Sequence, residues 1–270
     1  MHKRAWFSIM ALFLFIVLDV FPQNTTSEMI EVESHLKNGN FNQAITILTD
    51  LILKNPTNEI IYYWRAFSYF MSGDLSNAMV DIEKSISLKD KDSKSYTLKG
   101  DILLRMNQIT DSLKYYNLAI QYDKTNPEAY LGAGIATIQN GDIDDAIWFW
   151  EEAIKYDPQN FFAYRNLAMA YQEKKIYDKS IYNWGKCIEL NNSNPILYFE
   201  RSRVYFNVNP GLALQDLNKA IELKDDFAQA YWTRGFIQKL FFRNMVESEK
   251  DFNKAVSIDE RLRNQPYPDW

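Results

Sequence analysis

The side chains that most often carry catalysis or bind metals are scarce in this sequence. It contains one cysteine, Cys187, and two histidines, His2 and His35. A single cysteine cannot form an intramolecular disulfide, and two distant histidines make a His/Cys metal site unfavourable. We interpret Cys187 as a packing residue, because no histidine is placed to activate it. His35 is interpreted as a surface or cap residue. No pair of carboxylates and no phosphate-binding loop stands out, so we expect no catalytic residue, no metal and no cofactor.

Arginines and aspartates, in contrast, recur in a pattern that could form ion pairs. Three arginines, each placed directly before a small residue, lie in segments rich in apolar side chains: Arg65, Arg201 and Arg234. Each is followed by an aspartate: Asp81, Asp216 and Asp251. Where the arginine is replaced, as by Lys99, the matching aspartate is absent too. An unpaired charge in a helix–helix contact is costly. We therefore expect three partly buried ion pairs, Arg65–Asp81, Arg201–Asp216 and Arg234–Asp251, and prefer this structural role to ligand binding.

These pairs belong to a longer internal repeat. Tyrosines recur at steps of 34 or 33 residues, at positions 62, 96, 130, 164, 198 and 231. Small residues recur with the same period at three further positions in each unit. Within a unit, apolar residues follow three- and four-residue steps, which predicts two helices. Turn residues such as Gly73-Asp74, Gly141-Asp142 and Asn209-Pro210 fall between the two helices. Each unit is therefore expected to be an antiparallel helix hairpin, which needs neighbours to bury its apolar faces.

The repeat resembles the tetratricopeptide repeat family. The segment AYLGAGIATIQNGDIDDAIWFWEEAIKYDP, residues 129–158, is close to a consensus unit. The resemblance implies an all-α fold, a right-handed α-solenoid of stacked antiparallel helix hairpins. It covers seven repeats within residues 24–262, and the first repeat is the weakest. The expected repeats are 25–58, 59–92, 93–126, 127–160, 161–194, 195–227 and 228–262.

The family resemblance also implies where a partner binds. First helices of such hairpins line a concave groove that commonly holds peptides or partner helices. Counting from the repeated tyrosines, we predict that the groove is aromatic and basic, a composition typical of interface hot spots. The predicted partner-binding residues are Tyr63, Phe67, Phe70, Arg105, Arg165, Phe199, Arg203, Phe206, Trp232, Phe236 and Lys239. The alternative is that about half of such side chains pack against the next first helix.

Some family members clamp a C-terminal carboxylate with lysine and asparagine. The clamp asparagine would fall five residues after the repeated tyrosine. This chain has no asparagine there; it has, for example, Phe67, Asp101 and Arg203. We therefore do not assign that activity.

Two further features are aromatic. Trp148 falls in a column of mostly polar or small residues on a second helix, as either a second contact or a packed side chain. The tail, residues 263–270, contains Tyr267 and Trp270, which could fold back as a cap or serve as a docking peptide.

The N-terminus has the pattern of a secretory signal peptide. His2, Lys3 and Arg4 precede an apolar run of about 14 residues, shorter than the ~20 that span a bilayer. We expect cleavage near residue 23, and an uncleaved membrane anchor over residues 5–20 is the alternative. Membrane contact is expected only through this segment, if it is retained.

Composition agrees with an exported binding protein. The chain is 47% hydrophobic with 9 glycines and 8 prolines, ample for a core. Its net charge of −5 offers no basic surface for nucleic acid. We expect a non-catalytic interaction scaffold outside the cytoplasm, periplasmic or associated with the cell envelope, that holds a protein or peptide partner and assembles envelope complexes. A chaperone-like holder of exported chains is the main alternative, and an enzyme on a helical scaffold is the remote one. The oligomeric state is open.

Overall fold

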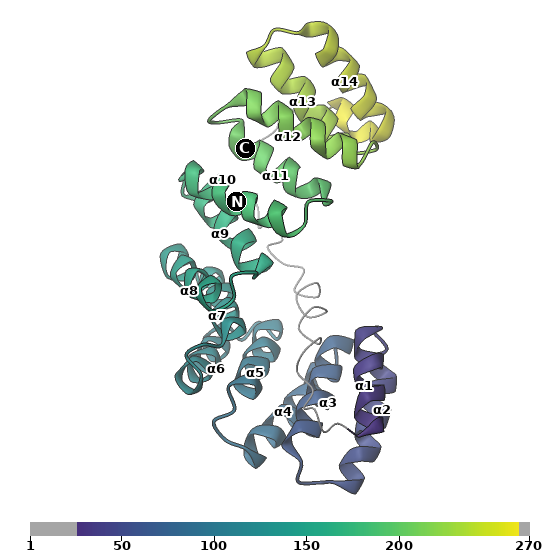
Figure 1. Cartoon of the computed structure of the whole chain (residues 1–270), viewed down its shortest axis with the longest axis vertical. Coiled ribbons are helices and arrows are strands. Elements are labelled where there is room, and N and C mark those ends of the chain that lie inside the picture. Colours follow the sequence, from purple (N-terminus) through teal and green to yellow (C-terminus); the bar gives the residue numbers. More distant parts are fainter. Residues whose placement is uncertain (1–25, 265–270) are drawn as a thin grey trace. The chain divides into compact units, whose positions relative to one another are not determined.

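The computed structural model describes residues 26–264, and all regular structure in this range is helical. The predicted signal peptide, residues 1–23, and the tail residues Tyr267 and Trp270 lie outside the described residues. The chain divides after Tyr156 into two compact units. The first unit contains α1 Ser27–Lys37, α2 Phe41–Lys54, α3 Glu59–Ser72, α4 Leu75–Leu88, α5 Ser93–Arg105, α6 Ile109–Tyr122, α7 Pro127–Gln139 and α8 Ile143–Tyr156 (Figure 1). The second contains α9 Phe161–Glu173, α10 Tyr177–Leu190, α11 Pro195–Tyr205, α12 Pro210–Leu223, α13 Ala228–Phe241, α14 Met245–Ile258 and the 3-10 helix η3 Glu260–Asn264.

Consecutive helices pair as hairpins, and the hairpins stack on their sequence neighbours within each unit. The all-α solenoid fold expected from the repeat is confirmed. The predicted turns begin and end these helices. Gly73 adopts φ +92° and ends α3, and the Asp74 side chain then accepts a hydrogen bond from the backbone N–H of Asn77 in α4. Asn209 caps α12 in the same way, with Pro210 at its first turn.

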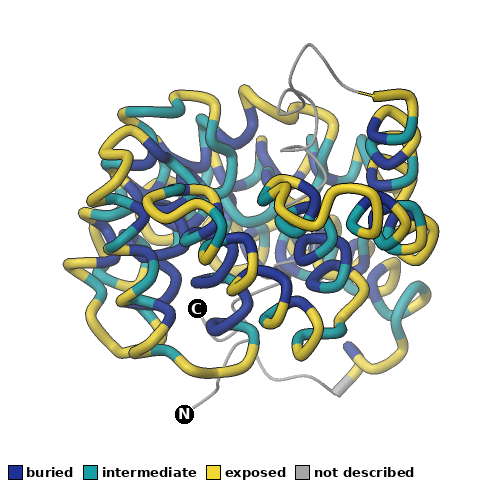
Figure 2. Tube along the Cα trace, turned by 90° about the horizontal axis from the view of Figure 1, so that it is seen from below, coloured by how far each residue is buried: buried dark blue, intermediate teal, exposed yellow. Residues whose placement is uncertain are grey.

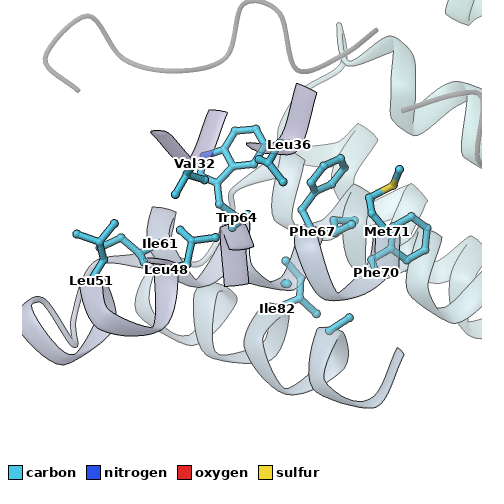
Figure 3. Close-up of a cluster of buried hydrophobic side chains, with 14 of the residues drawn as sticks. Val32, Leu36, Leu48, Leu51, Ile61, Trp64, Phe67, Phe70, Met71 and Ile82 are labelled. Atoms are coloured by element: carbon cyan, nitrogen blue, oxygen red, sulfur yellow. The ribbon is translucent and has the colours of Figure 1, made fainter. Parts of the chain in front are cut away.

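Most helices bury one face, so buried and exposed stretches alternate along the chain (Figure 2), whereas α7 is buried at every position from Ala129 to Thr137. In the first unit, Trp64, Leu48, Ile82 and their neighbours form one apolar cluster between the first two hairpins and α5 (Figure 3). Small residues on one helix leave room for large side chains of a neighbouring helix. The Tyr116 ring lies against Gly100 and Gly132, where an added Cβ would come within 2.7 Å and 2.4 Å of the Tyr116 Cε1 atom. The stack therefore depends on glycine at these contacts.

Among the described residues, none of the helices is long and apolar enough to cross a bilayer.

Candidate functional site

Three arginines join the two helices of their own hairpins. Arg65 donates from Nε and Nη2 to the Asp81 carboxylate at 2.6 and 2.8 Å. The equivalent bonds are 2.8 and 2.7 Å for Arg201 to Asp216, and 2.8 and 2.7 Å for Arg234 to Asp251. The aspartates are buried and the arginines are partly buried. Bonding to the carboxylate raises the pKa of each guanidinium, which keeps the three arginines protonated.

Two of these arginines also reach into the repeat before their own. Arg65 Nη1 donates to Thr49 Oγ1 of α2 at 3.1 Å, and Arg234 Nη1 donates to Asn218 Oδ1 of α12 at 2.7 Å. The corresponding residue before Arg201 is Gly185 of α10, which has no side chain to accept such a bond. A Cβ built on Gly185 would lie 3.7 Å from Arg201 Nη1. Sequence reasoning missed this second bond, although the acceptors lie sixteen residues before each arginine.

Lys99 replaces arginine in the third repeat and finds different partners. Its Nζ donates to Glu83 of α4 at 2.8 Å and lies 4.4 Å from the centre of the Tyr115 ring. A cation–π contact with Tyr115 thus stands where the three arginine-bearing repeats have an aspartate.

The predicted groove residues of the first unit are less open than expected. Tyr63 is half-buried, whereas Phe67 and Phe70 are 5% and 1% exposed. The expectation of an open surface at Phe67 and Phe70 is therefore corrected, because both belong to the apolar cluster around Trp64 (Figure 3). Arg105 of α5 donates to the Phe70 carbonyl at 2.7 Å, and its guanidinium lies 5.2 Å from the Phe70 ring centre. Arg105 thus ties α5 to the end of α3.

Asp101, one turn before Arg105, is an acid in an apolar setting. It accepts a 2.6 Å hydrogen bond from the hydroxyl of the buried Tyr116. Burial, with the nearby Glu128 charge, raises the pKa of Asp101 to about 7, although the Tyr116 bond acts in the opposite direction. The sequence signal for this acid was its place in the column that holds the clamp asparagine in other family members.

The second unit brings aromatic and basic first-helix residues together. Phe206, directly after α11, stacks on Phe236 of α13 with ring centres 6.3 Å apart, and the ring centres of Phe199 and Phe227 are 5.0 Å apart. Phe236 is 6% exposed, so the open placement expected for it is also corrected, because its ring packs between first helices. Trp232 is half-buried against Phe252, 4.8 Å away.

The basic residues of this set differ in exposure. Arg165 of α9 is half-buried, and Lys239 near the end of α13 is exposed. Arg203 is also half-buried and donates to Glu200 at 2.7 Å. Together with Phe199, Phe206 and Trp232, these three residues define what we call the second-unit surface.

The other notable residues have structural surroundings. Cys187 is fully buried, burial raises the pKa of its thiol to about 12, and its Sγ lies 3.8 Å from the Phe161 carbonyl. A thiol with so high a pKa is a poor nucleophile. His35 lies 3.7 Å from Glu31 on the surface of α1. Trp148 of α8 is 52% exposed and contacts Phe149 and Tyr130 edge-on.

Comparison with known proteins agrees with this arrangement. Sequence models described as tetratricopeptide repeats match residues 31–88, 93–126 and 149–182. The chain thus contains tetratricopeptide repeats. One relative, the TPR repeat-containing protein MJ1428 of Methanocaldococcus jannaschii, is 30% identical over 100 residues, which is 37% of this chain. The matched segment spans 18% of that relative's length.

Solved tetratricopeptide repeat structures share the fold. The C-terminal part of a TPR repeat-containing protein from Cytophaga hutchinsonii has a TM-score of 0.68 and 24% identity, over 85% of this chain and 95% of that one. YrrB, described as a TPR protein with an unusual peptide-binding site, has a TM-score of 0.61 and 20% identity, over 67% and 94%. Tetratricopeptide repeats generally bind proteins or peptides, which implies a protein–protein interaction scaffold.

Proposed function

We propose that this scaffold is non-catalytic, acts outside the cytoplasm, and binds a peptide or partner domain along its first helices during assembly of a cell-envelope complex. The observation that carries the binding proposal is the second-unit surface. The first helices α11 and α13 carry aromatic side chains, and α9, α11 and α13 carry cationic ones. Aromatic residues and arginine are enriched at interface hot spots. The peptide-binding site named for YrrB supports the use of this fold for peptide capture.

The chemistry of this surface favours one kind of ligand. Arg165 and Lys239 supply positive charge, while Trp232 and Phe199 supply apolar area. A peptide with carboxylates spaced among apolar side chains complements both. Export is supported by the basic start and apolar run of residues 1–20, a pattern typical of secretory signals. Mass spectrometry of the N-terminus of the protein recovered from cells tests export separately from binding.

Affinity capture from the native host tests the binding proposal. The chain is tagged at its C-terminus, expressed with its own N-terminus, and its co-purifying proteins are quantified by mass spectrometry. One partner near equal stoichiometry, lost with Phe199→Ala/Trp232→Ala, is the expected result. Tyr182→Ala is the matched control, because Tyr182 is a 60% exposed aromatic on the second helix α10 of the same unit.

Two results contradict the proposal. Many proteins captured at low stoichiometry indicate a chaperone-like holder of exported chains. A single partner that survives the Phe199→Ala/Trp232→Ala change but is lost with Trp148→Ala places the contact on α8.

A further inference from the structure

The turn between α13 and α14 exposes a run of apolar side chains. Within residues 240–246, Leu240, Phe241, Phe242, Met245 and Val246 are 51%, 48%, 50%, 58% and 65% exposed. Elsewhere, exposed apolar side chains such as Leu53 and Val80 stand apart from one another in the sequence, which is normal for soluble proteins. These five lie within seven consecutive residues, where α13 ends and α14 begins, and form an apolar tip of the kind that marks protein or membrane contact. Val208 and Leu212, in the turn of the preceding hairpin, are exposed as well.

The apolar tip, residues 240–246, is held in a defined conformation. Arg243 adopts φ +51°, the left-handed region, and so reverses the chain after α13. The Asn244 N–H donates to the Gln238 carbonyl at 3.0 Å, and the Asn244 side chain caps α14 by accepting from the Glu247 N–H at 3.3 Å. At the base, the Phe241 ring meets Phe206 edge-on at 5.3 Å. The remaining apolar side chains therefore stand on a fixed turn that is exposed on its outer side.

Positive charge borders this tip. Lys239 and Arg243 are exposed, and within residues 26–264 neither forms an ion pair. The acid that follows, Glu247, is paired with Lys250 at 2.6 Å, and Glu249 is the next acid on α14. Two uncompensated cations thus lie directly before the apolar tip and in its middle.

We propose that the apolar tip is a membrane-contacting loop that inserts into the interface of a bilayer rich in anionic lipids. Apolar side chains on a turn can enter the acyl boundary, while Lys239 and Arg243 stay at the headgroup phosphates. Each cation near an anionic surface contributes an attraction that salt weakens. This contact is separate from the N-terminal apolar run and shares only Lys239 with the second-unit surface. It would orient the last hairpin toward the lipid.

A single fluorescent label reads this contact locally, even if the N-terminal segment also holds the chain on the membrane. We would attach a polarity-sensitive dye to Val246→Cys in the full chain. The native Cys187 is fully buried and its thiol pKa is about 12, so it reacts poorly, and labelling of the unmodified chain measures the background. Leu53→Cys, at a 78% exposed site on α2, is the matched control position.

With vesicles of phosphatidylethanolamine and phosphatidylglycerol, the emission at Val246→Cys should shift to the blue and be quenched by brominated acyl chains. The Leu53→Cys label should do neither. Arg243→Gln should lower the ratio of inserted to solvent-facing label at Val246→Cys about fivefold. Phe242→Ser should abolish the blue shift. Arg243 is chosen over Lys239 because Lys239 also belongs to the second-unit surface.

Three outcomes overturn the proposal. Equal emission at the two positions with vesicles shows that the tip stays in water. A blue shift without lipid, together with a dimer in sedimentation, assigns the tip to a second copy of the chain. A blue shift without lipid in a monomer shows that the chain covers its own tip. Partner capture that depends on Phe199 and Trp232 is unaffected by any of these results, so the two proposals fail separately.

Discussion

Arg65 is held by three hydrogen bonds, two to Asp81 in its own hairpin and one to Thr49 in the hairpin before. The Asp81 side chain is 5% exposed and that of Arg65 is 17% exposed, so water replaces these bonds poorly. We expect Arg65→Ala to lower the free energy of unfolding by about 3 kcal/mol, since it leaves a buried carboxylate unpaired. Urea unfolding of Arg65→Ala, Asp81→Ala and the double variant measures the coupling.

Lys219→Ala is the control for this cycle. Lys219 and Glu222 form a 2.7 Å pair whose side chains are 39% and 67% exposed, and such pairs contribute less than about 1 kcal/mol. Strictly additive losses at Arg65 and Asp81 would disprove the coupling.

Asp101 gives the stability a specific pH dependence. Its pKa is raised from the ordinary 3.8 to about 7, so the folded chain holds a proton that the unfolded chain has lost in this window. Stability from this group is therefore complete below pH 3.8 and declines as the pH rises toward about 7. We expect the difference in unfolding free energy between Asp101→Asn and the parent chain to grow over that window.

Urea unfolding at a series of pH values measures this difference. Asp123→Asn is the control, because Thr125 lowers the pKa of Asp123 and that group therefore acts in the opposite direction. A pH profile that is unchanged by Asp101→Asn would show that Asp101 is ionised in the folded chain at all these pH values.

At the scale of helices, close contact between hairpins depends on Gly132 of α7. A Cβ there would lie 2.4 Å from the Tyr116 ring, and that ring is fixed by its bond to Asp101. We expect Gly132→Ala to destabilise by about 1 kcal/mol, because overpacking outweighs the gain in helix propensity. Thermal unfolding followed by circular dichroism measures the change.

Gly185→Ala serves as the matched variant. Its Cβ would be no nearer than 3.7 Å to another residue, so only the propensity gain of about 0.5–1 kcal/mol remains and the chain should become more stable. Equal effects at the two glycines would contradict the packing argument.

The elements show what could be predicted from the sequence. Features that depend on one hairpin could be predicted, because a 34-residue repeat displays them several times. They include the apolar periodicity, the turns at Gly73 and Asn209, and the paired Arg and Asp columns. Contacts between hairpins are harder to predict from the sequence, because each depends on residues of two different repeats. The Tyr116–Gly132 contact has no repeated column, and the Arg234–Asn218 bond joins two repeats although its acceptor lies sixteen residues before the arginine; both were missed. For the same reason, the depth at which Phe67 and Phe236 lie was misjudged.

At the scale of the whole chain, stability should be local, since each repeat contacts mainly its neighbours. The last hairpin is covered by η3, where Leu262 is 4% exposed and packs with Ala228 and Ala255. We expect Leu262→Ala to speed hydrogen exchange in α13 and α14 and to leave α1 to α4 unchanged. Exchange mass spectrometry checks this, and faster exchange throughout the chain would argue for a single cooperative unit.

The backward bonds of Arg65 and Arg234 also limit how such an array can evolve. If residues 195–227 were lost by recombination, Arg234 would face Gly185 instead of Asn218 and would have no side-chain acceptor there. A repeat that carries the arginine makes this backward bond only after a predecessor that offers a hydroxyl or an amide, and Arg201, which follows Gly185, has no such acceptor there. The order of the repeats is itself inherited information, and exchanging modules between such proteins requires matching each junction as well as each module.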